Sequence, residues 1–213
     1  KTVTIDRVAP DVLPVHGTIP ILYGAIGPQA LRQAGRVGDG VILTSFAPVS
    51  YVRWAVEQVR AGAEEAGRDP ASLEIAAIIT TRVTDDPVAA LDELKPWFAL
   101  AHGMTRRGEL LLQGSGVDLA ALERIRAKLN IDAIVADGLE PYLHAYQRVS
   151  PDDVRETVPD DLVAMTAIVG DAAHCRTRLA EYADAGVTHV IVDSPQPAAD
   201  LLAALRPAAT SPV

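Results

Sequence analysis

The sequence predicts an α/β fold in which four parallel β-strands are each followed by a helix. Short apolar runs alternate with stretches of helical periodicity, and helix-ending glycines separate them. Aromatic residues make up only 4% of a chain that is 49% hydrophobic, which suits a helix-rich α/β protein. Four such β–α units amount to half of an eight-stranded (β/α)8 barrel or to a small open sheet. A chain of 213 residues is long enough to bury one sizeable core.

The predicted strands are short and almost wholly apolar, as expected for strands covered on both faces. They cover residues 19–25, 41–44, 73–83 and 187–192. The helices are indicated by apolar residues at three- and four-residue spacing, by Pro28 and Pro87 at helix starts, and by Gly67 after a helix end. They are expected over residues 28–37, 48–66, 85–102, 171–185 and 201–205.

The regular alternation is interrupted between residues 103 and 169, where helical patterns follow one another without a predicted strand. Two of these helices are expected over residues 138–149 and 159–170. We interpret this stretch as a helical insertion within a single domain spanning residues 1–213. Residues 1–17 are expected to be a loop excursion, and a domain seldom begins inside one. The sequence therefore indicates either a truncated chain or a half-barrel that pairs with something else.

Composition and charge exclude several classes of protein. The net charge of −9 is spread along the chain, so no basic stripe is available for nucleic acid or for an anionic membrane. Cys175 is the only cysteine, which rules out an intramolecular disulfide and favours a cytoplasmic protein. No signal peptide and no run of about 18 apolar residues is present. The histidines form no paired zinc motif, so no metal is expected.

The sequence Tyr-Gly-Ala-Ile-Gly-Pro at residues 23–28 joins the first predicted strand to its helix. Gly24 and Gly27 permit a close approach of the backbone that a Cβ atom would prevent. The helix beginning at Pro28 directs its free N–H groups to the same edge of the sheet. Together these features predict an anion pocket, and the alternative is a turn with a purely structural role.

Polar residues also end the other predicted strands, at the sheet edge where β/α proteins bind ligands. Thr44 and Ser45 could hydrogen-bond a phosphate or ribityl group, or they could begin the following turn. Arg82 could pair with a phosphate or an acidic tail, or it could be a surface arginine. Asp193 and Ser194 end the last strand, where they could contact a ligand or simply belong to a loop at the rim.

One further candidate binding site lies in the predicted insertion, and the tryptophans and acidic pairs have structural explanations. The Thr-Arg-Arg sequence at residues 105–107 is either a small patch for an anionic ligand or part of a solvated loop. Trp54 and Trp97 are expected to be packing residues on helices. The acidic pairs stand before helices, where helix capping accounts for them, and no pair of carboxylates suggests general acid–base catalysis.

Several stretches of the chain resemble a known superfamily. They are IPILYGAIGPQALRQAGRVGDGVIL, VRAGAEEAGRDPASLEI, VPDDLVAMTAIVGD and RLAEYADAGVTHVIV. In this order they resemble the luciferase-like flavin and deazaflavin oxidoreductases, and within them the coenzyme F420-dependent branch related to methylenetetrahydromethanopterin reductase. The resemblance extends from residue 19 to about residue 207. It implies a (β/α)8 TIM barrel with inserted segments, of which this chain is the C-terminal half.

The resemblance also implies a function and a site. The activity would be hydride transfer between reduced deazaflavin and a small organic substrate, with F420 as cofactor and FMN as the alternative. Gly24, Ala25, Ile26 and Gly27 would contact the cofactor phosphate, and Thr44 and Arg82 are further candidates for cofactor binding. Two alternatives remain open: an FMN-dependent monooxygenase, and a non-catalytic half-barrel that binds a ligand or forms dimers. The expected partners are a second copy of the chain or the missing N-terminal half.

Overall fold

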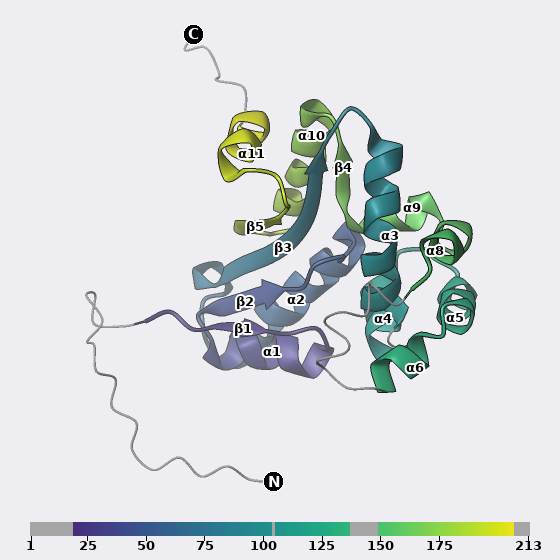
Figure 1. Cartoon of the computed structure of the whole chain (residues 1–213). Coiled ribbons are helices and arrows are strands. Elements are labelled where there is room, and N and C mark those ends of the chain that lie inside the picture. Colours follow the sequence, from purple (N-terminus) through teal and green to yellow (C-terminus); the bar gives the residue numbers. More distant parts are fainter. Residues whose placement is uncertain (1–18, 104, 137–148, 207–213) are drawn as a thin grey trace, which may run out of the picture.

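The computed structural model describes residues 19–103, 105–136 and 149–206 (Figure 1). The expected loop over residues 1–17 and nearly all of the helix expected over 138–149 lie outside the described residues. In the described part, five parallel strands form one sheet: β1 (Leu22–Gly24), β2 (Gly40–Leu43), β3 (Glu74–Val83), β4 (Ile168–Gly170) and β5 (His189–Asp193). The predicted parallel α/β fold is therefore confirmed.

Strand β3 is the centre of this sheet. Strands β1, β2 and β3 are neighbours in that order, and β5 pairs with β3 along residues 76–80. The short strand β4 pairs with the end of β3, along residues 81–83. Strands β1, β2, β3 and β5 therefore run side by side in the same direction, as in part of a β/α barrel.

Strand β4 corrects the expectation that residues 103–169 hold no strand and that residues 159–170 are helical throughout. Helix α9 (Asp160–Thr166) ends at Ala167, whose backbone is already extended, with φ −127° and ψ 162°. The next two residues, Ile168 and Val169, are β-branched and favour a strand. A run this short continues the apolar spacing of the helix, so periodicity alone does not separate it from the helix.

One hydrophobic core lies between the sheet and three helices: α1 (Pro28–Val37), α2 (Val49–Glu65) and α10 (Ala172–Asp184). Helices α1 and α2 touch at two glycines. An added Cβ atom would lie 1.9 Å from the Val59 carbonyl oxygen at Gly35, and 2.1 Å from the Arg32 carbonyl oxygen at Gly62. Glycine is therefore required at both positions by this close helix contact.

A second hydrophobic core joins the helices that follow β3. These are α3 (Pro87–Gly103), α4 (Thr105–Leu112), α5 (Leu119–Lys128), α6 (Ile131–Ala136), α8 (Pro151–Thr157) and α9. Figure 1 shows them gathered on the right of the sheet. The almost buried Lys95 of α3 is 2.7 Å from a carboxylate oxygen of Asp92 and 2.6 Å from one of Asp160, which ties α3 to α9. The division of the chain into one domain with an insertion stays a prediction.

Alternate side chains of the sheet point to two faces. One face, with Val41, Leu43 and Ile79, is buried against α1, α2 and α10. The opposite face, which we call the inner face, consists of the residues that pair with Ile42 and Thr80 and those two positions along from them. In β1, β2, β3 and β5 they are Leu22, Gly24, Gly40, Ile42, Glu74, Ala76, Ile78, Thr80, Arg82, His189, Ile191 and Asp193. Glu74 and His189 lie at the amino end of the inner face, apolar residues lie in its middle, and Thr80, Arg82 and Asp193 lie at its carboxyl end.

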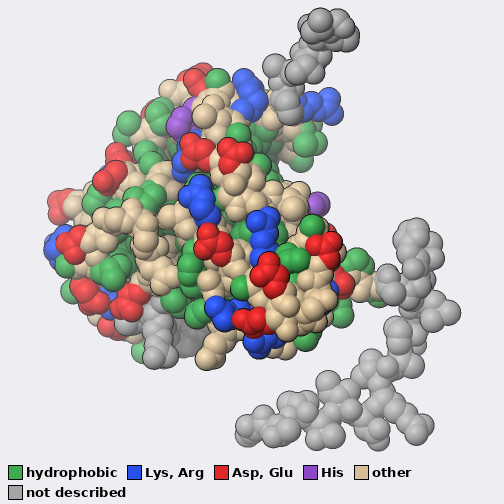
Figure 2. All heavy atoms as spheres, turned by 180° about the vertical axis from the view of Figure 1, so that it is seen from behind, with side chains coloured by type: hydrophobic (Ala, Val, Ile, Leu, Met, Phe, Trp, Pro, Cys, Tyr) green, Lys and Arg blue, Asp and Glu red, His purple; other side chains and the backbone are tan. Residues whose placement is uncertain are grey.

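Surface charge is mixed. On the side turned away from the viewer in Figure 1, acidic and basic side chains are interspersed without a large patch of one sign (Figure 2). No helix in residues 19–103, 105–136 and 149–206 has the length and apolar character that crossing a membrane requires.

Candidate functional site

A cleft of about 570 Å³ opens at the carboxyl end of the inner face. Its walls come from the loop after β2, the end of β3, helix α3 and the end of β5. The lining residues are Ser45, Phe46, Thr80, Arg82, Glu93, Leu94, Trp97, Asp193, Ser194 and Pro195. Ligands of parallel β/α proteins bind at this edge of the sheet, so the cleft is the first candidate for a binding site.

Thr80, Arg82 and Asp193 meet in this cleft from two neighbouring strands. The Thr80 hydroxyl donates a hydrogen bond to a carboxylate oxygen of Asp193 at 3.0 Å. The Arg82 guanidinium donates to the backbone carbonyls of Thr81 and Asp193 at 3.0 and 3.4 Å. Because parallel pairing places Thr80 opposite Asp193, the register of β3 and β5 brings this polar group together.

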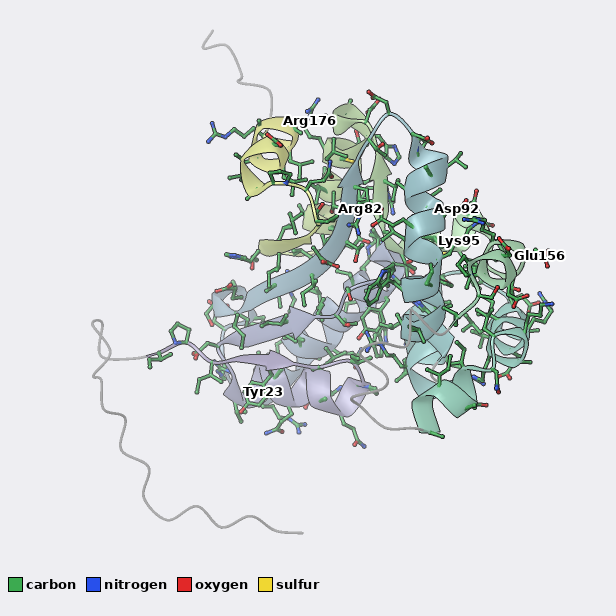
Figure 3. The ribbon with its side chains drawn as sticks, in the orientation of Figure 1. Tyr23, Arg82, Asp92, Lys95, Glu156 and Arg176 are labelled. Atoms are coloured by element: carbon green, nitrogen blue, oxygen red, sulfur yellow. The ribbon has the colours of Figure 1, made fainter. Side chains whose placement is uncertain are left out.

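Arg82 lies where the sequence places a cofactor-binding arginine, in the interior of the molecule between β3 and α3 (Figure 3). Its guanidinium already has an acidic partner, since Nε and Nη2 both contact Oε1 of Glu93, at 3.4 and 3.2 Å. This ion pair joins α3 to β3. Arg82 can therefore accept an anionic ligand only in competition with Glu93.

Trp97 belongs to the wall of the cleft. The expectation that it serves only as a packing residue is wrong, because 42% of its surface is exposed and its side chain lines the opening. Together with Phe46 and Leu94 it provides an apolar side to a cleft whose opposite side is polar. A planar heterocycle with polar substituents suits such a lining.

The turn between β1 and α1 forms a second part of the same edge. Gly27 is the N-cap of α1, with φ −83°, and no side chain caps the helix. A Cβ atom at Gly24 or Gly27 would meet nothing within 4 Å. Both glycines therefore border open space outside the chain, and the close approach of a ligand to their backbone stays a prediction. Ala25 is buried, so only its backbone could face a ligand.

Tyr51, in the first turn of α2, holds this turn in place. Its hydroxyl donates a 2.7 Å hydrogen bond to the carbonyl oxygen of Ile26, and its side chain is fully buried. Burial raises the pKa of the Tyr51 hydroxyl well above its usual value, while the positive charge of Arg107 opposes the rise. The phenol is therefore a neutral hydrogen-bond donor and has a positioning role.

Thr44 follows β2, at the same edge. Its hydroxyl oxygen accepts a 2.7 Å hydrogen bond from Nη2 of Arg107, which lies 63 positions further along the chain in α4. The reading of residues 105–107 as part of a solvated loop is wrong for Arg107, which is helical and reaches the strand end. No local pattern indicates this contact. The only signal in the sequence is a basic residue within the predicted insertion.

The described residues offer no obvious group for covalent catalysis. Cys175 is buried, its thiol donates to the carbonyl oxygen of Gly170 at 3.4 Å, and burial raises its pKa. In the part of the chain that the structure describes, no three His, Cys, Asp or Glu side chains are grouped to hold a metal ion.

Comparison with known proteins identifies a matching family and similar proteins. The family model described as luciferase-like monooxygenase matches residues 2–189. A 5,10-methylenetetrahydromethanopterin reductase from Methanolobus tindarius is 30% identical over 179 residues, which cover 84% of this chain and 49% of that protein. A putative coenzyme F420-dependent oxidoreductase from Mycobacterium tuberculosis is 29% identical over 184 residues, covering 84% of this chain and 48% of that protein.

A solved structure has the same fold. The coenzyme F420-dependent tetrahydromethanopterin reductase from Methanopyrus kandleri matches with a TM-score of 0.59 and 26% identity, over 83% of this chain and 45% of that one. The chain thus spans about half the length of the relatives that it matches.

Proposed function

Since this chain belongs to the luciferase-like monooxygenase family, we propose that it is part of an F420-dependent oxidoreductase that transfers a hydride between reduced deazaflavin and a small organic substrate. The observation that carries the proposal is the carboxyl edge of the sheet. A cleft of about 570 Å³ with apolar and polar lining residues opens at this edge, and the uncapped start of α1, with open space at Gly24 and Gly27, follows β1 at the same edge. The F420-dependent relatives favour F420 over FMN.

In this proposal each part of the edge has a distinct role. The cleft between α3 and the inner face receives the flat deazaflavin ring, with Trp97 and Phe46 on its apolar side. The turn at Gly24–Gly27 and the start of α1 bind the cofactor phosphate through backbone N–H groups. Bound F420 supplies the hydride chemistry, and the chain orients it and excludes water.

Open strand edges support a half-barrel. Within the described residues, the outer edges of β1 and β5 have no strand partner, and apolar side chains are exposed along both. Ile21, just before β1, is 61% exposed, and Val190 of β5 is 37% exposed. Parallel sheets are normally covered, so we infer that four more β–α units close the barrel. An N-terminal half or a second copy of the chain, forming a homodimer, could supply them.

The first test is a titration of F420 with the 213-residue chain, followed by the fluorescence of the cofactor, with FMN in parallel. Gly24→Val and Gly27→Val should each weaken F420 binding by about tenfold or more, because a side chain then occupies the open space. Their stability should change by no more than about 1 kcal/mol, since a Cβ atom at either position has no protein atom within 4 Å.

Ala71→Val is the matched control. Ala71 is exposed and precedes β3, at the opposite end of the sheet, so its enlargement should leave F420 binding unchanged. If the chain binds neither F420 nor FMN, the claim of an enzyme is abandoned for the isolated chain. The alternative of a non-catalytic, dimer-forming module then predicts a stable dimer in light scattering.

A second test concerns the support of the phosphate turn. Tyr51→Phe removes the donor to the Ile26 carbonyl and should lower the free energy of unfolding by about 1 kcal/mol. It should also weaken F420 binding, because the turn loses its fixed position. Tyr182→Phe is the control: it deletes a similar buried bond, 2.9 Å to the Ala47 carbonyl, on α10. Equal effects of the two variants on F420 affinity would contradict the positioning role of Tyr51.

A further inference from the structure

Arg107 is a partly buried cation without an anionic partner in the described residues. Its Nε atom is buried and has no hydrogen-bond acceptor among them, and no described carboxylate lies within 4.0 Å of the guanidinium. Among the other arginines that are at least partly buried, Arg68 and Arg176 donate to the backbone carbonyls of Gly35 and Ala204, whereas Arg82 and Arg126 have carboxylate partners. Arg82 contacts Glu93, and Arg126 contacts Glu123 at 2.8 Å. A buried N–H group of a charged side chain costs free energy when it has no hydrogen-bond acceptor. We therefore expect a bound group to supply an acceptor for this N–H.

Thr44, which contacts Arg107, and the start of α2 carry further polar groups. The Thr44 oxygen accepts from Arg107, which leaves the hydroxyl hydrogen of Thr44 free to donate elsewhere. The side-chain oxygen of Ser50, in the first turn of α2, is buried and also has no partner among the described residues. Helix α2 begins without a side-chain cap and without an acidic residue in its first turn. The two hydroxyl groups and the free backbone N–H groups at the start of α2 can all donate hydrogen bonds to a negatively charged ligand.

Tyr51 connects this group to the start of α1. Its hydrogen bond to Ile26 brings the first turn of α2 against the residue that precedes the N-cap Gly27. Arg107 lies close enough to Tyr51 to lower the pKa of its hydroxyl against the effect of burial. The start of α2 thus contacts the turn that leads from β1 into α1, and Arg107 contacts Thr44 after the neighbouring strand β2.

A purely structural role for Arg107 would be to attach α4 to the end of β2. That role uses one N–H group and leaves the buried Nε unsatisfied. A neutral side chain could donate the same hydrogen bond to Thr44 without the cost of burying a charge. The planar guanidinium is instead suited to bind two oxygens of one oxyanion at once.

We propose that Arg107, Thr44 and the first turn of α2 bind an oxyanion of the phosphate class, carried either by the cofactor or by the substrate. The proposal deepens the proposed function, because it adds a cation from the predicted insertion to the same edge. The two sources share one chemistry and are separated by the experiment below.

The probe is inorganic phosphate, titrated into the full chain by calorimetry at constant ionic strength, with chloride as the blank. The wild-type chain should bind phosphate saturably, and Arg107→Gln should weaken binding by about tenfold or more. Arg107→Lys, which keeps the charge, should recover part of the loss, and Thr44→Val should weaken binding to a smaller extent. Arg124→Gln, at an exposed arginine of α5, is the control and should bind like the wild type.

Competition with F420 then identifies the source. If phosphate displaces F420, and Arg107→Gln weakens F420 but not a deazaflavin that lacks the phosphate, the oxyanion belongs to the cofactor. If phosphate and F420 bind together, the oxyanion belongs to the substrate. A chain that binds phosphate through Arg107 but no F420 would overturn the proposed function and keep this site. Absence of phosphate binding, or an Arg107→Gln variant that loses stability but binds phosphate normally, overturns the site.

Discussion

Replacing Gly35 by alanine is expected to lower the free energy of unfolding by about 3 kcal/mol or more, although alanine is the better helix former. The new Cβ atom would lie 1.9 Å from the carbonyl oxygen and 2.9 Å from the carbonyl carbon of Val59, and 2.9 Å from the backbone nitrogen of Ala63. All three are backbone atoms of α2, so no side chain can move aside. The two helices must separate, and the core that they share with β2 must open.

Urea denaturation followed by circular dichroism measures this change. Gln33→Ala is the control, because Gln33 is an exposed residue of the same helix and its replacement adds no contact. The control should leave stability within about 0.5 kcal/mol of the wild type. A Gly35→Ala chain as stable as that control would show that α1 and α2 are not in the described contact.

Acid is expected to destabilise the chain through His102, by roughly 3 kcal/mol between pH 6.5 and pH 4. His102 is fully buried at the end of α3, stacked on Phe98 with 4.3 Å between ring centres. Burial lowers its pKa from 6.5 to about 4, the hydrogen bond to the Phe98 carbonyl opposes this, and the charge of Arg107 adds to it. The unfolded chain binds a proton at higher pH than the folded chain.

The stabilisation from neutral His102 is thus complete above pH 6.5, is lost as the pH falls toward 4, and does not change further below that value. His102→Phe keeps the stacking and removes the titration. In that pH range the free energy of unfolding of the wild type should fall more steeply than that of the variant, by about 1.4 kcal/mol per pH unit at most. Parallel pH profiles would contradict this account, as would an NMR titration of His102 near its usual pKa.

Much of the fold follows from local patterns in the sequence. The strands around residues 22–24, 40–43, 74–83 and 189–193 and the helices after them are where apolar runs and helical spacing predict them. The missed strand β4 is three residues long, and a run of that length carries too little periodicity. Gly24, Gly27 and Thr44 lie at the carboxyl edge of the sheet, as their place after predicted strands indicates. Their binding of a cofactor stays a prediction.

The partners of the site residues could not be read from the sequence. Glu93 pairs with Arg82 because α3 folds back along β3, and Trp97 reaches the cleft for the same reason. His102 carries no sequence signal for a lowered pKa, since its burial depends on Phe46 and Phe98 around it.

By itself the sequence determined the order of four of the five strands and of the helices that follow them, their parallel direction and the edge where polar strand ends gather. These features depend on hydrophobic spacing and on residues that begin or end helices, and both act over a few positions. Only the tertiary structure decided which distant groups meet there. Arg107 and Thr44 are 63 positions apart, and β3 and β5 are joined at Thr80 and Asp193 across 113 positions. Such contacts result from how the helices after β3 pack against the sheet, because packing of whole elements has no counterpart in a local pattern.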